Sequence, residues 1–215
     1  MSYSNSWLYR RIYLPWRRRK LLNRYLDAIH AGQKPVFIHI NKTAGSSIAA
    51  SLGITEGHYT LREIEAAYLK RFKEELPLNI PVFAAVRNPY DRLVSQYAYR
   101  VATNQNQLQK RPLDFKQWVK EVFVIKNPNY RDRELMFIPQ TSWIATQADR
   151  KVQLVRFEKL EETSSSLLKN YGKGPLEWKK RSTHDSYQTY YDEETQAIVE
   201  QVFASDFKTF NYEFL

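Results

Sequence analysis

The chain has 215 residues, 43% of them hydrophobic, and a formal net charge of +10. This length favours one domain with a substantial core, and the absence of cysteine excludes disulfides and cysteine-based metal sites. No run approaches the roughly 20 apolar residues that span a bilayer, no secretory signal follows the charged N-terminus, and the four scattered histidines do not indicate a zinc site. We therefore expect a soluble, cytoplasmic protein without a metal.

Residues 1–34 form a basic segment ahead of the first predicted strand, and we expect this segment to be helical. Residues 1–35 hold eight basic residues against the single acidic residue Asp27, so most of the net charge lies here. A solvated helix whose aromatic side chains pack on the main domain explains the composition. The alternatives are contact with an anionic membrane surface, an acidic glycan or nucleic acid. The interleaved aromatic residues are Trp7, Tyr9, Tyr13 and Trp16.

Strands and helices alternate along residues 35–215. Short apolar, β-branched runs predict strands, and apolar residues at helical spacing predict helices. Thr60 with Glu63 has capping-box spacing, and Asn88 before Pro89 suits a helix start. The alternation indicates a single α/β domain whose mainly parallel central sheet is flanked by helices. The predicted strands are 35–40, 81–87 and 152–157, and the predicted helices are 48–52, 61–76, from 89 onward, 115–123, 139–146, 158–171 and 193–210.

The loop between the first strand and the next helix, residues 41–47, is the clearest candidate for a binding site. A strand that leads through small residues into a helix gathers backbone N–H groups at the helix N-terminus, where an anion is favoured. Lys42 can reach a phosphate oxygen, and Gly45 lets the backbone approach a ligand. A structural turn with a surface lysine is the alternative interpretation. The hydroxyl donors of this loop are Thr43, Ser46 and Ser47.

Arg87 ends the second predicted strand. Ligands of open α/β sheets bind beyond the carboxyl ends of the strands, so we expect Arg87 beside the loop 41–47 if the two strands are neighbours. Its planar guanidinium suits a phosphate group. Ser95 lies about two helical turns further on and can share the same ligand if the helix leans toward it. We expect Asp91 to cap the helix or to orient an arginine.

Two segments resemble the carbohydrate-type (family 2) sulfotransferases. Residues 37–47, Phe-Ile-His-Ile-Asn-Lys-Thr-Ala-Gly-Ser-Ser, are similar to their 5′-phosphosulfate loop. Residues 86–95, Val-Arg-Asn-Pro-Tyr-Asp-Arg-Leu-Val-Ser, are similar to their 3′-phosphate motif. Both motifs occur in the expected order at strand-to-helix junctions. The resemblance covers roughly residues 35–215, including the segments 156–158 and 190–192, and leaves residues 1–34 unexplained.

The resemblance implies a P-loop-like sulfotransferase domain over residues 35–215. It also implies sulfuryl transfer, without a metal, from 3′-phosphoadenosine 5′-phosphosulfate (PAPS) to an acceptor hydroxyl, with a carbohydrate as the favoured acceptor. Lys42 would balance charge on the departing bridging oxygen. Asn41 stands where the family usually has Pro, and we expect altered loop stiffness without lost binding. The implied PAPS-binding residues are Lys42, Thr43, Ala44, Gly45, Ser46 and Ser47 in the loop, Arg87 and Ser95 at the 3′-phosphate, and Arg181 and Ser182 in a basic loop that closes over the donor.

Transfer to a hydroxyl benefits from a general base that takes its proton. His58, two residues before the predicted cap at Thr60, is our candidate, and the family's catalytic His or Glu often lies in this region. His184 and Glu56 are the alternatives. His39 falls inside the first apolar strand, where a buried structural role is expected.

Two other classes of function remain open. A P-loop ATPase or kinase needs its lysine directly after the second glycine of G-x-x-x-x-G-K-[ST], whereas Lys42 precedes Gly45 and no clear metal-binding Asp follows an apolar strand. A nucleic-acid-binding module driven by residues 1–34 would show strong salt dependence and no turnover. Nothing after residue 35 resembles a fold that reads bases. We expect the stretches near 100–112, 124–135 and 172–190 to shape the acceptor site.

Overall fold

A parallel three-stranded sheet lies at the centre of the structure. The computed structural model describes residues 12–54, 57–174, 176 and 184–214. The strands lie in the order β1 (Val36–Ile38), β2 (Val82–Val86) and β3 (Val152–Arg156), and β2 pairs in parallel with both neighbours. Every residue of β2 is buried, as expected of an apolar strand covered on both faces. The predicted α/β fold, with a parallel sheet flanked by helices, is confirmed.

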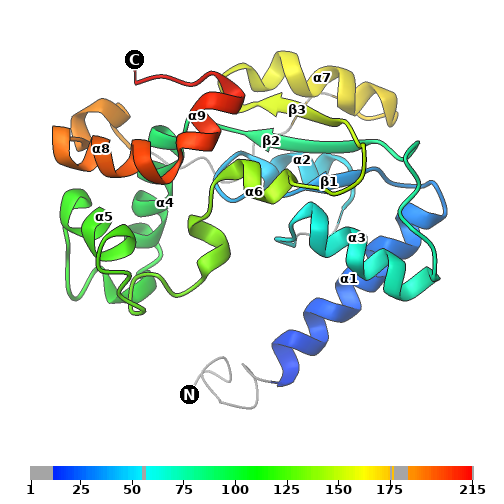
Figure 1. Ribbon diagram of the computed structural model, residues 1–215, viewed down its shortest axis with the longest axis horizontal. Coiled ribbons are helices and arrows are strands. Elements are labelled where there is room, and N and C mark those ends of the chain that lie inside the picture. The colour runs from blue at the N-terminus through cyan, green and yellow to red at the C-terminus, as the bar shows by residue number, and fades with distance from the viewer. Residues whose placement is uncertain (1–11, 55–56, 175, 177–183, 215) are drawn as a thin grey trace.

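The described part of the chain places helices around this sheet (Figure 1). They are α1 (Leu14–His30), α2 (Gly45–Ser51), α3 (Leu61–Phe72), α4 (Pro89–Ala102), α5 (Phe115–Phe123), α6 (Gln140–Ile144), α7 (Leu160–Asn170), α8 (Glu193–Val202) and α9 (Ala204–Phe210). Short 3-10 helices are η3 (Gln105–Gln107), η4 (Glu134–Phe137), η5 (Phe157–Lys159) and η6 (Tyr187–Tyr190). α7 packs against β3, α5 packs against α8, and α1 contacts α3.

The helix starts follow the local sequence signals. Thr60 Oγ1 accepts a hydrogen bond from the Glu63 backbone N–H, and the Glu63 carboxylate accepts one from the Thr60 N–H, which completes the predicted capping box of α3. The Asn88 side chain accepts a hydrogen bond from the Tyr90 N–H at the start of α4. α3 ends at Phe72, four residues before the predicted end, because Lys73 takes the left-handed conformation that closes a helix.

The prediction of one continuous helix over residues 193–210 is wrong. α8 and α9 are separate helices that meet at Phe203, whose backbone is not helical (φ −107°, ψ 22°). Phe203 is fully buried and its ring packs against Phe123. Beyond the break, the buried Asp206 carboxylate accepts hydrogen bonds from the backbone N–H groups of Gln140 and Thr141, both at 2.8 Å. These contacts turn α9 toward the start of α6, which a straight helix would not allow.

The inner face of α1 packs on the domain. Tyr25, Leu26 and Ile29 are buried, and the Tyr25 hydroxyl donates to the Pro35 carbonyl and accepts from the Phe37 N–H, which fixes the end of α1 at the start of β1. The N-terminal end of α1 projects beyond α3 (Figure 1), while Arg18 still contacts His58 and Tyr59. Among the described residues, no helix has both the length and the apolar character needed to cross a membrane.

Candidate active site

The loop after β1 contains two residues in the left-handed conformation. Lys42 (φ 64°) and Ala44 (φ 62°) adopt it, and Gly45 then begins α2. Between them the buried Thr43 donates a hydrogen bond from Oγ1 to the Ile40 carbonyl at 2.9 Å, which ties the turn together. Turns in which left-handed residues alternate with others gather backbone N–H groups into a concave site for anions. The loop therefore has the backbone form that an anion site requires.

A cavity of about 510 Å³ lies over this loop. Lys42, Ala44, Gly45 and Ser46 form one side of it, and His58 reaches it from the segment before α3. Two of the stretches expected to shape the acceptor site, 100–112 and 124–135, also contribute residues. The remaining lining residues are His39, Asn41, Gln96, Tyr99, Arg100, Gln105, Asn106, Asp132, Arg133 and Met136.

The glycine at position 45 is explained by its neighbour His39. A Cβ atom at this position would lie 2.0 Å from Cδ2 of His39 and 2.5 Å from its Nε2, distances that no side chain tolerates. The His39 side chain is buried, as predicted, and its ring centroid lies 4.4 Å from that of His58. His39 therefore supports both the loop and His58.

The hydrogen bonding of His58 defines the proton positions on its ring. Nδ1 lies 2.8 Å from the His39 carbonyl oxygen, which can only accept a hydrogen bond. Nδ1 must therefore carry a proton, so in the neutral ring the basic lone pair is on Nε2. The backbone around His58 is held by α1, because Nη2 of Arg18 donates to the His58 carbonyl at 2.9 Å. This is the tautomer that a general base uses when a second group orients its ring.

The side chain of Arg87 lies on the loop, at the end of β2. Only 7% of the side chain is exposed, and Nη1 donates to the Lys42 carbonyl at 3.2 Å. Nε donates to a carboxylate oxygen of Asp91 at 2.7 Å, so Asp91 orients this arginine. The guanidinium carbon lies 3.9 Å from the ring centroid of Phe157. The strand ends are thus neighbours, and the expected contact between Arg87 and the loop is present.

The backbone of Arg87 and Asn88 is fixed by buried polar groups. The Gln140 side chain accepts from the Arg87 N–H at 3.0 Å and donates to the Arg87 carbonyl at 2.8 Å. Gln140 Nε2 also donates to Asp206 at 3.2 Å. Glu158 accepts from the Asn88 N–H at 2.6 Å. Arg87 is therefore held on a rigid frame that leaves little freedom at the strand end.

Positive charge dominates the cavity wall. Nζ of Lys42 lies 4.3 Å from the ring centroid of Tyr99, which holds the ammonium group at the wall. The carboxylate of Asp132 pairs with the buried Arg100 at 2.8 Å, and Arg133 adds a further cation to the lining. The cavity is thus suited to an anionic ligand.

A strand, a loop of small and polar residues, a helix and a buried arginine at the next strand end are the features on which the family resemblance depends. Residues 29–213 match the sequence model of the sulfotransferase family. The chain belongs to the sulfotransferase family. No curated protein and no solved structure matches the chain. The family match begins at residue 29, so nearly all of α1 precedes it.

The structure of this sulfotransferase-family member brings some predicted site residues together and separates others. Thr43, Ser47 and Ser95 are buried and do not line the cavity over the loop. His184 also lies outside this cavity; its Nε2 is 3.4 Å from Nη2 of Arg87 and 3.6 Å from a carboxylate oxygen of Asp91. The predicted residues Glu56, Arg181 and Ser182 lie outside the described residues, as do Trp7 and Tyr9 of the basic segment.

Sequence analysis missed the contribution of α4 to the cavity of this family member. Gln96 and Tyr99 line it, three residues apart on one side of the helix, next to Arg100 of the expected stretch 100–112. The sequence signal that could have found these residues is a row of polar side chains at helical spacing along α4, a helix with many apolar residues. Gln140 was also missed, because its contact with Arg87 joins residues 53 positions apart.

Asn41, which stands where this family usually has Pro, ties the loop to its surroundings. Nδ2 donates to Gln96 at 3.0 Å and to the Met136 carbonyl at 3.3 Å, while Oδ1 accepts from the buried Arg92 at 3.4 Å. Burial lowers the pKa of Arg92 to about 10, partly offset by attraction to Asp206. Asn41 is therefore part of a buried polar network.

We expect Asn41→Ala to lower the free energy of unfolding by about 1–3 kcal/mol, because it leaves buried partners unsatisfied. Thermal unfolding checks this result, with a lowering of Tm by about 2–4 °C per kcal/mol for a chain of this size. Asn170→Ala, at an exposed position at the end of α7, is the control and should leave Tm unchanged. An equal Tm for the two variants would show that the network around Asn41 adds no stability.

Proposed function

We propose that this protein is a sulfotransferase that moves a sulfuryl group from PAPS to an acceptor hydroxyl, with a carbohydrate as the acceptor class. One observation carries the proposal. Lys42 and His58 line the same cavity, while Arg87, outside that cavity, contacts the same loop through the Lys42 carbonyl. Lys42 and His58 lie at the cavity, and the Arg87 guanidinium lies at another part of the loop. This separation suits a donor that carries negative charge at two positions.

The proposed donor contacts follow this division. The backbone of the loop and the start of α2, residues 43–47, would hold the 5′-phosphate, with Ser46 the hydroxyl that faces the cavity. Arg87 would hold the 3′-phosphate, together with Ser95 if α4 adjusts on binding. Arg181 and Ser182, in the basic loop singled out in the sequence, are proposed to contact the donor as well.

The proposed chemistry uses His58 and Lys42 at the point of transfer. The acceptor oxygen forms a bond to sulfur as the bond between sulfur and the bridging oxygen breaks, and His58 Nε2 takes the hydroxyl proton. The Lys42 ammonium group offsets the negative charge that develops on the bridging oxygen. The products are the sulfated acceptor and 3′-phosphoadenosine 5′-phosphate (PAP).

A second hollow provides a route for the acceptor. A groove of about 730 Å³ runs between α1 and η4, and it shares His58, Arg133 and Met136 with the cavity over the loop. Its α1 side includes Arg18 and Leu21. We propose that the acceptor lies in this groove, with its reacting hydroxyl at His58.

Nucleotide binding tests the proposed donor without any knowledge of the acceptor. Binding to the folded state raises Tm by mass action, so PAP, AMP and ATP with Mg²⁺ can be compared by thermal shift and calorimetry. We expect a clear preference for PAP over AMP. A preference for ATP with Mg²⁺ would instead favour a P-loop ATPase or kinase, and binding of none of the three would refute the proposed donor.

We expect Lys42→Ala to lower kcat by about 10–100-fold, because the charge that Lys42 meets develops in the transition state. PAP affinity should change much less. The rate is measured as PAP released from PAPS with a panel of mono- and disaccharides as acceptors. Lys169→Ala, at an exposed position near the end of α7, is the charge-matched control. Equal losses of rate and of PAP affinity would contradict this role for Lys42.

A further inference from the structure

One face of α1 is turned away from the domain and carries apolar, aromatic and basic side chains. The face opposite to it holds the buried residues Tyr25, Leu26 and Ile29. At 3.6 residues per turn, Trp16, Lys20 and Arg24 fall on the outward side. Arg17 lies at the edge of this side, where it also lines the groove between α1 and η4, and the exposed Ile12 and Tyr13 directly precede the helix. We call this the outer face of α1; it comprises Ile12, Tyr13, Trp16, Arg17, Lys20 and Arg24.

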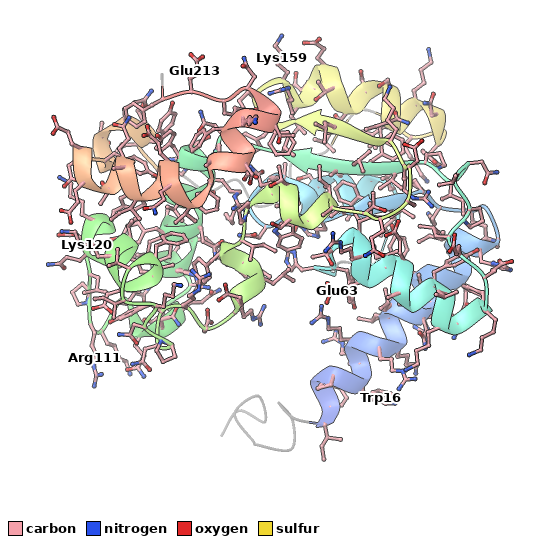
Figure 2. The ribbon with its side chains drawn as sticks, in the orientation of Figure 1. Trp16, Glu63, Arg111, Lys120, Lys159 and Glu213 are labelled. Carbon is pink, nitrogen blue, oxygen red and sulfur yellow. The ribbon has the colours of Figure 1, made fainter. Side chains whose placement is uncertain are left out.

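The N-terminal end of the outer face exposes large apolar side chains. Ile12 is 58% exposed, Tyr13 44% and Trp16 55%. The rings of Tyr13 and Trp16 lie 6.0 Å apart, and Nζ of Lys20 lies 5.0 Å from the Trp16 ring. Figure 2 shows Trp16 on the part of α1 that extends from the body of the molecule. The expectation that aromatic residues of this segment pack on the main domain is therefore wrong for Trp16.

The same face has a strong excess of positive charge. Arg17, Lys20 and Arg24 are all exposed, and the first turn of α1 holds no acidic residue. The acidic residue of α1, Asp27, is engaged by Arg71 on α3 at 2.7 Å. The positive charge of the outer face is therefore not offset by acids of the same helix.

We propose that the outer face of α1 binds an anionic membrane surface. A helix that places aromatic and aliphatic side chains at the boundary between headgroups and acyl chains, with basic residues beside them, lies in the plane of the interface. Trp and Tyr suit this boundary because each ring joins an apolar body to a polar atom. The exposed Ile12 favours lipid over nucleic acid or glycan, since an aliphatic side chain gains from acyl chains and gains little from phosphates or sugar hydroxyls.

This binding would also orient the groove that leads to His58. Arg17, at the edge of the outer face, lines that groove together with Arg18 and Leu21, so docking of the outer face would place the groove beside the bilayer. The membrane contact itself does not depend on the sulfotransferase reaction. Membrane binding and PAP binding can therefore be measured separately on the same preparation.

Co-sedimentation of the full chain with vesicles tests the proposal. The vesicles are made of phosphatidylcholine alone or of phosphatidylcholine with phosphatidylglycerol. We expect binding to the anionic vesicles only, weakened by added salt. Lys20→Glu with Arg24→Glu should weaken this binding by about tenfold or more, and Trp16→Ala by about threefold or more. The matched control is Lys110→Glu with Arg111→Glu, an exposed pair that should bind like the unchanged chain. Figure 2 shows Arg111 in a different region from α1.

Each other outcome overturns the proposal. These outcomes are no binding to anionic vesicles, equal binding to both kinds of vesicle, and equal losses in the two charge-reversal pairs. Unchanged binding after Trp16→Ala would reduce the contact to charge alone, contrary to the proposed insertion. A short DNA duplex that displaces the chain from vesicles at equal phosphate concentration would instead assign the outer face to nucleic acid. Retention of PAP affinity by each variant shows that the donor site and the fold are intact.

Discussion

Replacing Arg87 with Ala is expected to weaken PAP binding by about 2–4 kcal/mol, a loss of roughly 30- to 900-fold in affinity. If Arg87 contacts the 3′-phosphate as proposed, the substitution leaves that charged group without its guanidinium partner, in a site from which water is largely excluded. AMP lacks the 3′-phosphate, so its weaker affinity should hardly change. The difference between PAP and AMP, measured by calorimetry in both proteins, isolates the contact.

The surroundings of Arg87 make this substitution specific. Its side chain is held by Asp91, Phe157 and the Lys42 carbonyl, while its backbone is held independently by Gln140. Removal of the side chain therefore leaves the strand end in place. Arg87→Lys keeps the charge but loses the planar fork, and we expect an intermediate loss of PAP affinity. Arg111→Ala, at an exposed position, is the control. PAP affinity unchanged in Arg87→Ala would remove this residue from the donor site.

Local sequence signals predicted most of the fold. The three strands are apolar and β-branched, and the caps at Thr60 and Asn88 depend on residues within three positions of each other. Strands and caps of this kind are determined by residues close to them in sequence, so they can be predicted from the sequence. The break at Phe203 could not be predicted in this way, because the contacts that favour it come from Phe123 and Gln140, far away in sequence.

In the candidate site too, the features set by local sequence could be predicted and those set by long-range contacts could not. The loop after β1 and Arg87 could be found because each lies at a strand end, where parallel sheets bind ligands. The frame that holds Arg87 could not be found, since Asp206 acts on it through Gln140, and Glu158 bonds to the backbone of Asn88 across 70 positions. The resemblance at residues 156–158 thereby gains a physical reason: Phe157 contacts Arg87 and Glu158 holds the backbone of Asn88.

The part played by α1 near His58 lay beyond sequence reasoning. The basic composition indicated an anionic partner but gave no location for it. In the structure Arg18 donates to the His58 carbonyl and packs over the ring of Tyr59, while the outer face of the same helix stays exposed. One helix thus supports the proposed catalytic residue on one side and presents a separate binding surface on the other.

Replacing His58 with Ala is expected to lower kcat by about 10²–10⁴-fold, the range that a positioned general base contributes. PAP affinity should stay nearly constant, because the proposed 3′-phosphate contact is made elsewhere, at Arg87. The rate is measured as PAP released from PAPS with the same panel of saccharides, and the affinity by calorimetry. His184→Ala provides the contrast: His184 lies beside Arg87, so its loss should reduce PAP affinity more than kcat.

His58→Asn separates the two roles of the imidazole. An Asn amide can donate to the His39 carbonyl in place of Nδ1, which preserves the anchor, but it has no basic nitrogen to take a proton. If His58 is the base, the Asn variant loses as much of the rate as the Ala variant does. If His58 only supports the loop and its neighbour His39, the Asn variant retains most of the rate and Glu56 becomes the next candidate. The tautomer fixed by the His39 carbonyl favours the first result, because it leaves Nε2 able to accept the hydroxyl proton in the cavity that Lys42 also lines.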